Sequence, residues 1–215
     1  MTTYLSPIGY DSTRVTRPIL SRGLDAGDEV ILLLPETSKN DQRAADALAD
    51  VRRLLQEIEP DVGLSETHLP YDDLQQSVFI CTDLIQSLEQ DVVANFGGGA
   101  RDIYLAFTIA VLNQLSAVTT VIQFSDIDGQ VTQVRLPDLT IHVPDTGRLI
   151  LDFLSMADGS ATLPEIAAAI EPSKSTITRH VADLEEKGAV WTEMHGKTKH
   201  VELTFTGELH LESRA

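Results

Sequence analysis

A run of three glycines followed by an arginine is the feature of this sequence that points most directly to binding chemistry. It reads Asn95-Phe96-Gly97-Gly98-Gly99-Ala100-Arg101. Glycine has no Cβ, so a ligand can approach the backbone N–H groups of such a run closely. A helical pattern begins at Ala100, and the free N–H groups and positive dipole end of a helix N-terminus favour phosphate. Arg101 adds a positive charge that the first turn of a helix does not itself favour. The alternative is a tight strand-to-helix turn without a ligand.

A second turn of similar character lies near the start of the chain and reads Gly9-Tyr10-Asp11-Ser12-Thr13-Arg14. Ser12 or Asp11 can cap the following helix, with or without a ligand. Arg14 and Arg17 again place positive charge where a helix start prefers acidic residues. Together, the two cationic, glycine-containing turns predict a phosphate-bearing ligand, with Asn95 or Ser12 available to contact its ribose or base.

Alternating strand and helix patterns position both turns. The expected strands are 2–8, 30–34, 64–69, 91–94 and 117–124, and the expected helices are 12–21, 42–58, 72–88 and 100–115. Two further short strands are expected at 131–136 and 139–143. This alternation predicts an α/β fold with a Rossmann-like, doubly wound, mostly parallel sheet. Ligands of such sheets bind beyond the carboxyl ends of the strands, where both turns lie.

The last third of the chain has the pattern of a winged helix-turn-helix domain. Helices are expected at 146–156, 162–167 and 173–188, followed by a hairpin of strands 190–194 and 199–204 with its tip at 195–198. Ile177, Val181 and Leu184 form the apolar stripe of the third helix, and small, polar or cationic residues occupy the other side, as a helix that enters the major groove requires. The residues expected to contact DNA are Lys174, Ser175, Thr176, Thr178, Arg179, His180, Lys197 and Lys199.

The charge distribution supports this assignment locally, although the whole chain is acidic. The formal net charge is −17, which by itself argues against nucleic acid. Segment 172–200, however, holds five basic and four acidic residues, including four of the five lysines in the chain. Local charge decides which face meets phosphate. The alternative is a winged helix that binds protein.

The sequence lacks the motifs that are typical of several classes of enzyme and metal-binding protein. The dinucleotide-binding G-x-G-x-x-G spacing and the Walker A lysine are both missing, and the six histidines lack metal-ligand spacing. We therefore predict no catalytic residue, no metal site and no cofactor. The single cysteine, Cys81, cannot form an intrachain disulfide and is expected in the core. No apolar run is long enough to span a membrane and no signal peptide is recognisable, so we expect a cytoplasmic protein.

The two turns and the domain order resemble CARF domains, the CRISPR-associated Rossmann-fold sensors, and above all archaeal CARF–winged-helix transcription regulators. The resemblance covers nearly the whole chain, with a ligand-sensing and dimerisation domain at 1–143 and a DNA-binding domain at 144–215. The glycine–arginine turn is its more specific part, and the first turn is degenerate. The resemblance implies a homodimer with a pocket for cyclic oligoadenylate across its two-fold axis, with Gly9, residues 10–14 and residues 95–101 as the ligand-binding residues. It also implies regulation of CRISPR-Cas loci, in antiviral defence, through promoter DNA.

Two other functions stay open at this stage. A ring nuclease would cleave the cyclic oligoadenylate that it binds, and an adaptor would use its winged helix to bind protein. The acidity of the chain, with 11 arginines against five lysines, is compatible with a halophilic archaeal source.

Overall fold

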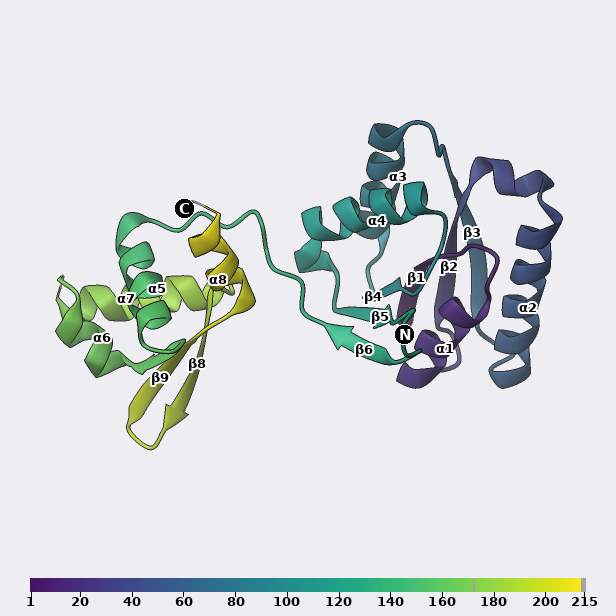
Figure 1. The fold of residues 1–215 in the computed structure, drawn as a ribbon. Helices are drawn as coiled ribbons and strands as arrows, with labels where there is room; N and C mark the ends of the chain where they lie inside the picture. Colours follow the sequence, from purple (N-terminus) through teal and green to yellow (C-terminus); the bar gives the residue numbers. More distant parts are fainter. Residues whose placement is uncertain (172, 214–215) are drawn as a thin grey trace. The chain divides into compact units, whose positions relative to one another are not determined.

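The computed structural model describes residues 1–171 and 173–213 and divides the chain into two compact units, Met1–Arg135 and Leu136–Ala215 (Figure 1). Pro172, which begins the segment of balanced charge, and the last two residues of the expected second domain lie outside the described residues. Each unit has its own hydrophobic core, so each is described by itself.

The first unit is built on a six-stranded sheet with the order β3-β2-β1-β4-β5-β6. Neighbouring strands are parallel except for β6, which pairs antiparallel with β5. The long apolar runs form the buried centre of the sheet, as expected for strands covered on both faces. The strands are β1 (Thr2–Pro7), β2 (Glu29–Pro35), β3 (Gly63–Leu69), β4 (Asp91–Phe96), β5 (Thr120–Phe124) and β6 (Val131–Val134).

Two pairs of helices cover the two faces of this sheet. Helices α1 (Thr13–Arg22) and α2 (Gln42–Ile58) pack together on one face, and α3 (Leu74–Ser87) and α4 (Arg101–Asn113) pack together on the other (Figure 1). The predicted Rossmann-like doubly wound fold is therefore confirmed. The strand order reverses between β1 and β4, so the turns that follow these two strands lie side by side at the carboxyl edge.

The second unit combines the three expected helices with a hairpin, and its predicted winged-helix architecture is confirmed. It contains α5 (Asp145–Met156), α6 (Leu163–Ala169), α7 (Lys174–Glu186), β8 (Val190–His195) and β9 (Thr198–Leu203). Thr162 and Glu165 form a capping box at the start of α6, which satisfies N–H groups that the helix leaves free.

The sequence analysis missed two elements of this unit. A short strand, β7 (Ser160–Thr162), pairs with β9, and helix α8 (Phe205–Glu212) follows the hairpin. In the first unit it likewise missed two short 3₁₀ segments, η1 (Glu36–Asn40) and η2 (Leu115–Ala117), the second of which delays the start of β5.

The expected strand at 139–143 is wrong. Segment 136–143 is a loop in which the carboxylate of Asp138 accepts hydrogen bonds from the backbone N–H and the hydroxyl of Thr140, which favours a turn over an extended strand. Asp138 N–H donates to the Thr206 hydroxyl, and Val143 is buried in the core of the second unit. The segment that the sequence pattern assigns to the first domain thus packs with the second unit. None of the helices in the described part of the chain is long and apolar enough to cross a membrane.

Candidate functional site

The backbones of the two turns pack directly against each other, and the glycines make this contact possible. A Cβ at Gly97 would lie 1.8 Å from the carbonyl oxygen of Arg14. Gly99 has φ of +113°, and a Cβ there would lie 2.7 Å from Cβ of Pro7. The space beside these two glycines is therefore filled by protein. This corrects the expectation that all three glycines leave the backbone open to a ligand.

Asn95 joins the two turns from below the surface. Its side chain is fully buried, and its Nδ2 donates to Oγ of Ser6 at 2.8 Å and to the carbonyl oxygen of Arg14 at 3.4 Å. Its Oδ1 is also buried and has no hydrogen-bond partner within the described residues. Asn95 thus stabilises the contact between the two turns from a buried position. Its amide does not reach the surface where a ribose or base would bind.

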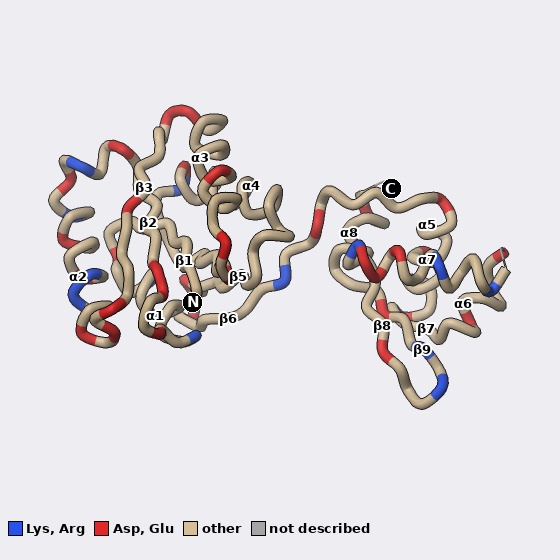
Figure 2. Tube along the Cα trace, turned by 180° about the vertical axis from the view of Figure 1, so that it is seen from behind, with Lys and Arg blue, Asp and Glu red and all other residues tan. Residues whose placement is uncertain are grey.

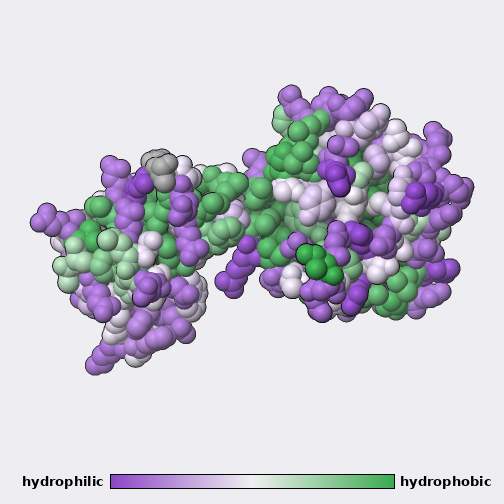
Figure 3. Space-filling model, in the orientation of Figure 1, coloured by the Kyte–Doolittle hydropathy of each residue, from purple (hydrophilic) through white to green (hydrophobic). Residues whose placement is uncertain are grey.

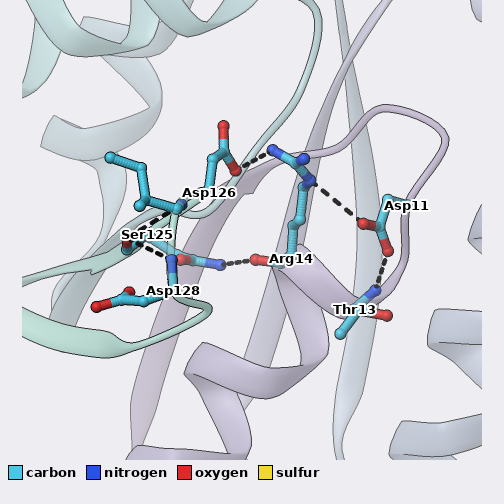
Figure 4. Close-up of polar contacts among 8 residues, drawn as sticks. Asp11, Thr13, Arg14, Ser125, Asp126 and Asp128 are labelled. Carbon is cyan, nitrogen blue, oxygen red and sulfur yellow. Dashed lines mark hydrogen bonds and ion pairs between the residues drawn. The ribbon is translucent and has the colours of Figure 1, made fainter.

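Arg14 lies between two carboxylates, as Figure 4 shows. Its Nε donates to Oδ2 of Asp11 at 3.2 Å, and its Nη1 forms a short ion pair with Asp126 in the turn between β5 and β6. Asp11 also accepts a hydrogen bond from the Thr13 N–H at 3.0 Å, whereas the side chain of Ser12, the N-cap residue of α1, makes no capping hydrogen bond. Partial burial raises the pKa of Asp11, but the hydrogen bonds from Thr13 and Arg14 outweigh this effect and lower the pKa overall. Arg14 therefore already has counterions before any ligand binds.

Two cavities flank the line where the turns meet, and Arg14 and Gly99 belong to both. The first, of about 370 Å³, lies over the ends of β1 and β2 and is lined by Ile8, Gly9, Tyr10, Asp11, Arg14, Leu34, Pro35, Thr37, Ser38, Asp41, Ala44, Gly99 and Ala100. The second, of about 680 Å³, lies over the ends of β4 and β5 and is lined by Arg14, Phe96, Gly97, Gly98, Gly99, Arg101, Tyr104, Gln123, Phe124, Ser125, Asp126, Ile127 and Thr132.

Most of the residues that the sequence assigned to ligand binding therefore line one of these two cavities, whereas Ser12, Thr13 and Asn95 line neither. The sequence analysis missed the β2–α2 connection and the β5–β6 turn. Both follow the carboxyl ends of strands, so the rule that located the first two turns also applies to them.

Arg101 is the exposed cation of the second cavity. No ion pair holds it within the described part of the chain, and Ala100, the N-cap of α4, offers no side-chain oxygen to the free N–H groups of the helix. Burial raises the pKa of the Tyr104 phenol in the same cavity, and the nearby charge of Asp126 adds to this effect. The edge formed by Arg101, the start of α4 and Arg14 can accept an anion. Among the described residues, no group of three or more His, Cys, Asp and Glu side chains could hold a metal ion.

Helix α7 in the second unit presents the residue types that the sequence predicted. Ile177, Val181 and Leu184 are buried, while Thr178 and Arg179 are exposed. Arg179 has no ion pair with any described residue, so its guanidinium can contact another molecule.

The lysines of this unit differ in their availability. Lys197 is exposed at the tip of the β8–β9 hairpin, where Figure 2 shows basic residues. Lys199 instead forms an ion pair with Glu185 at 2.9 Å, and Lys187 binds Asp183 and a backbone carbonyl at the same distance. Hydrogen bonds from Thr192 and Lys199 lower the pKa of Glu185, so this carboxylate stays charged and holds Lys199 against the domain.

Comparison with known families agrees with this two-part architecture. Residues 2–134 match the Csa3 CRISPR-associated Rossmann-like domain, a stretch that covers more than half of the chain. The chain belongs to this Csa3 family. Residues 147–192 match the IclR helix-turn-helix domain. Among curated proteins, none is similar enough to match this Csa3-family chain.

Solved structures are similar to this chain at low sequence identity. Enterococcus italicus Csm6, described as bound to cyclic hexa-2′-fluoro-hexa-dAMP, is 11% identical with a TM-score of 0.52, over 86% of this chain and 49% of that one. Can2 from Sulfobacillus thermosulfidooxidans, in complex with cyclic tetra-adenylate, is 15% identical with a TM-score of 0.43, over 99% of this chain and 57% of that one. The Csa3-family chain thus spans about half the length of these two proteins.

The contact between the turns predicts different outcomes at neighbouring glycines. Gly97→Ala places a methyl group against the Arg14 carbonyl, and we expect destabilisation at or above the roughly 1–3 kcal/mol typical of overpacking. At Gly98 a Cβ would lie 2.8 Å from Cδ of Arg14, which belongs to a flexible side chain. Gly98→Ala should therefore displace Arg14 at a smaller cost in stability. Denaturant unfolding of both variants measures the difference, and equal stabilities would contradict the packing described above.

Proposed function

We propose that this protein is a transcription regulator of CRISPR-Cas loci that senses cyclic oligoadenylate with its first unit and binds promoter DNA with its second. The observation that carries the proposal is the junction of the β1 and β4 turns, where Arg14 and Arg101 lie beside the start of α4 at the carboxyl edge of the sheet. Membership of the Csa3 family supports it, as does the helix-turn-helix match. We transfer the ligand class from Csm6, which shares the fold.

The chemistry of the junction suits phosphates linked in a ring. A cyclic oligonucleotide presents several phosphates toward its centre and needs a few cations and backbone donors there. Arg101 and the free N–H groups at the start of α4 provide both, because Ala100 does not cap them. Arg14 can add a second cation if the ligand replaces Asp126 as its partner.

This arrangement predicts opposite effects for two substitutions. Arg101→Ala should weaken the binding of cyclic oligoadenylate by about 1.5–3 kcal/mol, the range for a hydrogen bond to a charged group. Asp126→Asn should strengthen binding several-fold, because it removes the carboxylate that competes for Arg14. Calorimetric titration with cyclic tetra- and hexa-adenylate at high salt measures both changes.

Asp128→Asn is the matched control for Asp126→Asn. Asp128 lies in the same turn, where its carboxylate accepts the Gln130 N–H and has no contact with Arg14 among the interactions of the described residues. If neither ring binds to the unsubstituted protein, the proposed ligand is wrong. If Asp126→Asn and Asp128→Asn behave alike, the competition for Arg14 is wrong.

We propose binding without cleavage. Of the carboxylates that line the two cavities, Asp11 and Asp126 contact Arg14, and Asp41 accepts hydrogen bonds from the Tyr10 hydroxyl and the Arg43 N–H. The lining of the two cavities includes no histidine in the part of the chain that the structure describes. Each of these three carboxylates therefore already has a hydrogen-bond partner within the protein, which disfavours a role as general base. Mass spectrometry that finds linear products after incubation with the ring would favour the ring-nuclease alternative.

The electrostatics of the second unit support DNA as its partner over another protein. The exposed cations Lys174, Arg179 and Lys197 lie on α7 and the hairpin tip, the two elements by which a winged helix contacts the major groove and the backbone. Lys199 is less available, because its ammonium group already binds Glu185.

Substitution of these cations should separate affinity from specificity. Lys197→Ala should weaken binding to all DNA sequences alike and reduce the salt dependence, because a phosphate contact carries no base information. Arg179→Ala should also reduce discrimination between operator and unrelated DNA, if it contacts a base edge. Lys187→Ala is the control, since its ammonium group is bound within the domain. Fluorescence anisotropy over a salt series measures all three, and unchanged binding by the first two variants would refute the assigned DNA face.

We also propose that the protein is a homodimer and that its α3–α4 face is the contact. Figure 3 shows hydrophobic side chains gathered over these helices. Phe79 of α3 and Leu105 and Ile109 of α4 are 56%, 51% and 38% exposed. A ring with an even number of identical nucleotides has two-fold symmetry, and one copy of the β1 and β4 turns supplies half of a symmetric site.

A charge on the α3–α4 face should dissociate the dimer. Leu105→Glu should give a monomer in sedimentation at molar salt, because an unpaired carboxylate is costly to bury. Ile58→Glu is the matched control, since Ile58 is 47% exposed at the end of α2 on the other face of the sheet. If the unsubstituted protein sediments as a monomer, the proposed dimer is wrong. If Leu105→Glu and Ile58→Glu have the same oligomeric state, the α3–α4 face is not the dimer contact.

A further inference from the structure

The smaller of the two cavities, over the ends of β1 and β2, shares only Arg14 and Gly99 with the larger one and differs from it in lining. Its volume of about 370 Å³ lies within the roughly 300–1,000 Å³ typical of small-molecule sites. It shares Arg14 and Gly99 with the larger cavity. A molecule whose phosphate contacts this shared edge therefore has an adjacent hollow for the group attached to that phosphate.

The floor and one wall of the cavity suit a flat, largely apolar group. Ile8, Leu34 and Ala44 line it and are otherwise buried, at 2%, 1% and 4% exposure. Tyr10 also lines it and is held in place, because its hydroxyl donates to Asp41 at 2.7 Å and the guanidinium of Arg43 lies 4.1 Å from its ring centroid. A fixed aromatic side chain beside an apolar floor is the kind of surface on which nucleobases stack.

The polar groups of the cavity suit hydroxyl and amino groups better than phosphate. Hydrogen bonding from Tyr10 lowers the pKa of Asp41, which keeps this carboxylate charged at neutral pH. Asp11 and Asp41 line the cavity against one arginine, Arg14, which is itself paired. A second phosphate would therefore be repelled, whereas a ribose hydroxyl can donate to Asp41, as it does to the acidic residue after the second strand of dinucleotide-binding sheets.

Ser38 adds an independent indication of a missing polar partner. It lines the cavity, and its Oγ is shielded from solvent without a hydrogen-bond partner in the described parts of the chain. A shielded hydroxyl without a partner is unfavourable, and such groups call for an explanation. The edge of a base in the cavity would give this hydroxyl both a donor and an acceptor after rotation about its Cα–Cβ bond.

We propose that this cavity holds the base and ribose of one adenosine unit of the ligand, with Asp41 as acceptor for a ribose hydroxyl and the adjoining phosphate at Arg14. The inference rests on the proposed function, since it assumes an oligoadenylate. It adds a nucleoside subsite formed by Tyr10, the β2–α2 connection and the first turn of α2. This subsite makes recognition depend on ribose and base as well as on phosphate.

Filling the cavity tests the subsite. Ala44→Leu adds side-chain volume where Ala44 lines the cavity, and Ala45→Leu makes the same change at the exposed neighbouring position of α2. Calorimetry with whichever of cyclic tetra- and hexa-adenylate binds the unsubstituted protein should show about tenfold or greater loss of affinity for Ala44→Leu and no change for Ala45→Leu. Thermal unfolding checks that both variants are folded.

A second measurement does not depend on the folding of the Ala44 variant. Asp41→Asn keeps a side chain that can cap α2 and removes the charge. The unsubstituted protein should prefer the ribose ring over its 2′-deoxy analogue by about tenfold, and Asp41→Asn should lose most of this preference. Unchanged ligand affinity in Ala44→Leu together with an unchanged preference in Asp41→Asn would overturn the subsite and leave the proposed function intact. Failure of the unsubstituted protein to bind either ring would overturn both.

Discussion

The direct contact between the backbone of Gly97 and the carbonyl of Arg14 is the constraint on which the rest of the first unit depends. It brings the turns after β1 and β4 together at the point where the strand order reverses, and Asn95 secures the contact with two hydrogen bonds. Because the backbones meet, the Arg14 side chain is left on the surface between two cavities instead of in the space between the turns. A side chain on Gly97 would separate the strands' ends and remove the shared edge.

The second consequence of this contact is electrostatic. Arg14 is placed within reach of Asp11 on its own turn and of Asp126 from the β5–β6 turn, so the cation is neutralised inside a protein of net charge −17. Exposed ion pairs of this kind contribute little to stability, and a better anion can replace one partner at little cost. The folded protein thus keeps a cation ready at the edge of the sheet without exposing it as free positive charge.

Most of the strands and helices could be predicted because their signals are local. These signals are long apolar runs for buried strands, a 3.6-residue apolar stripe for α7, and the capping pair Thr162 and Glu165 for α6. The two turns were predictable for the same reason. The β7 strand was not, because three residues carry no periodicity. Local patterns also could not predict contacts between residues that are distant in the sequence, such as the ion pairs of Arg14 with Asp126 and of Lys199 with Glu185. From composition alone, Lys199 is expected to be a free cation, whereas in the folded domain its ammonium group is paired with Glu185.

The presence of Asp126 beside Arg14 has a consequence for discrimination among nucleotides. A lone monophosphate offers Arg14 little more than the carboxylate already provides, so replacing Asp126 yields little net gain in free energy. Under the proposed function, a ring that brings several phosphates at once also engages Arg101 and the start of α4, and in the proposed two-fold assembly it does so twice. If the protein binds such a ring as proposed, the carboxylate of Asp126 disfavours mononucleotides relative to the ring, and selectivity then depends on the number of charges delivered together as well as on the shape of the cavity.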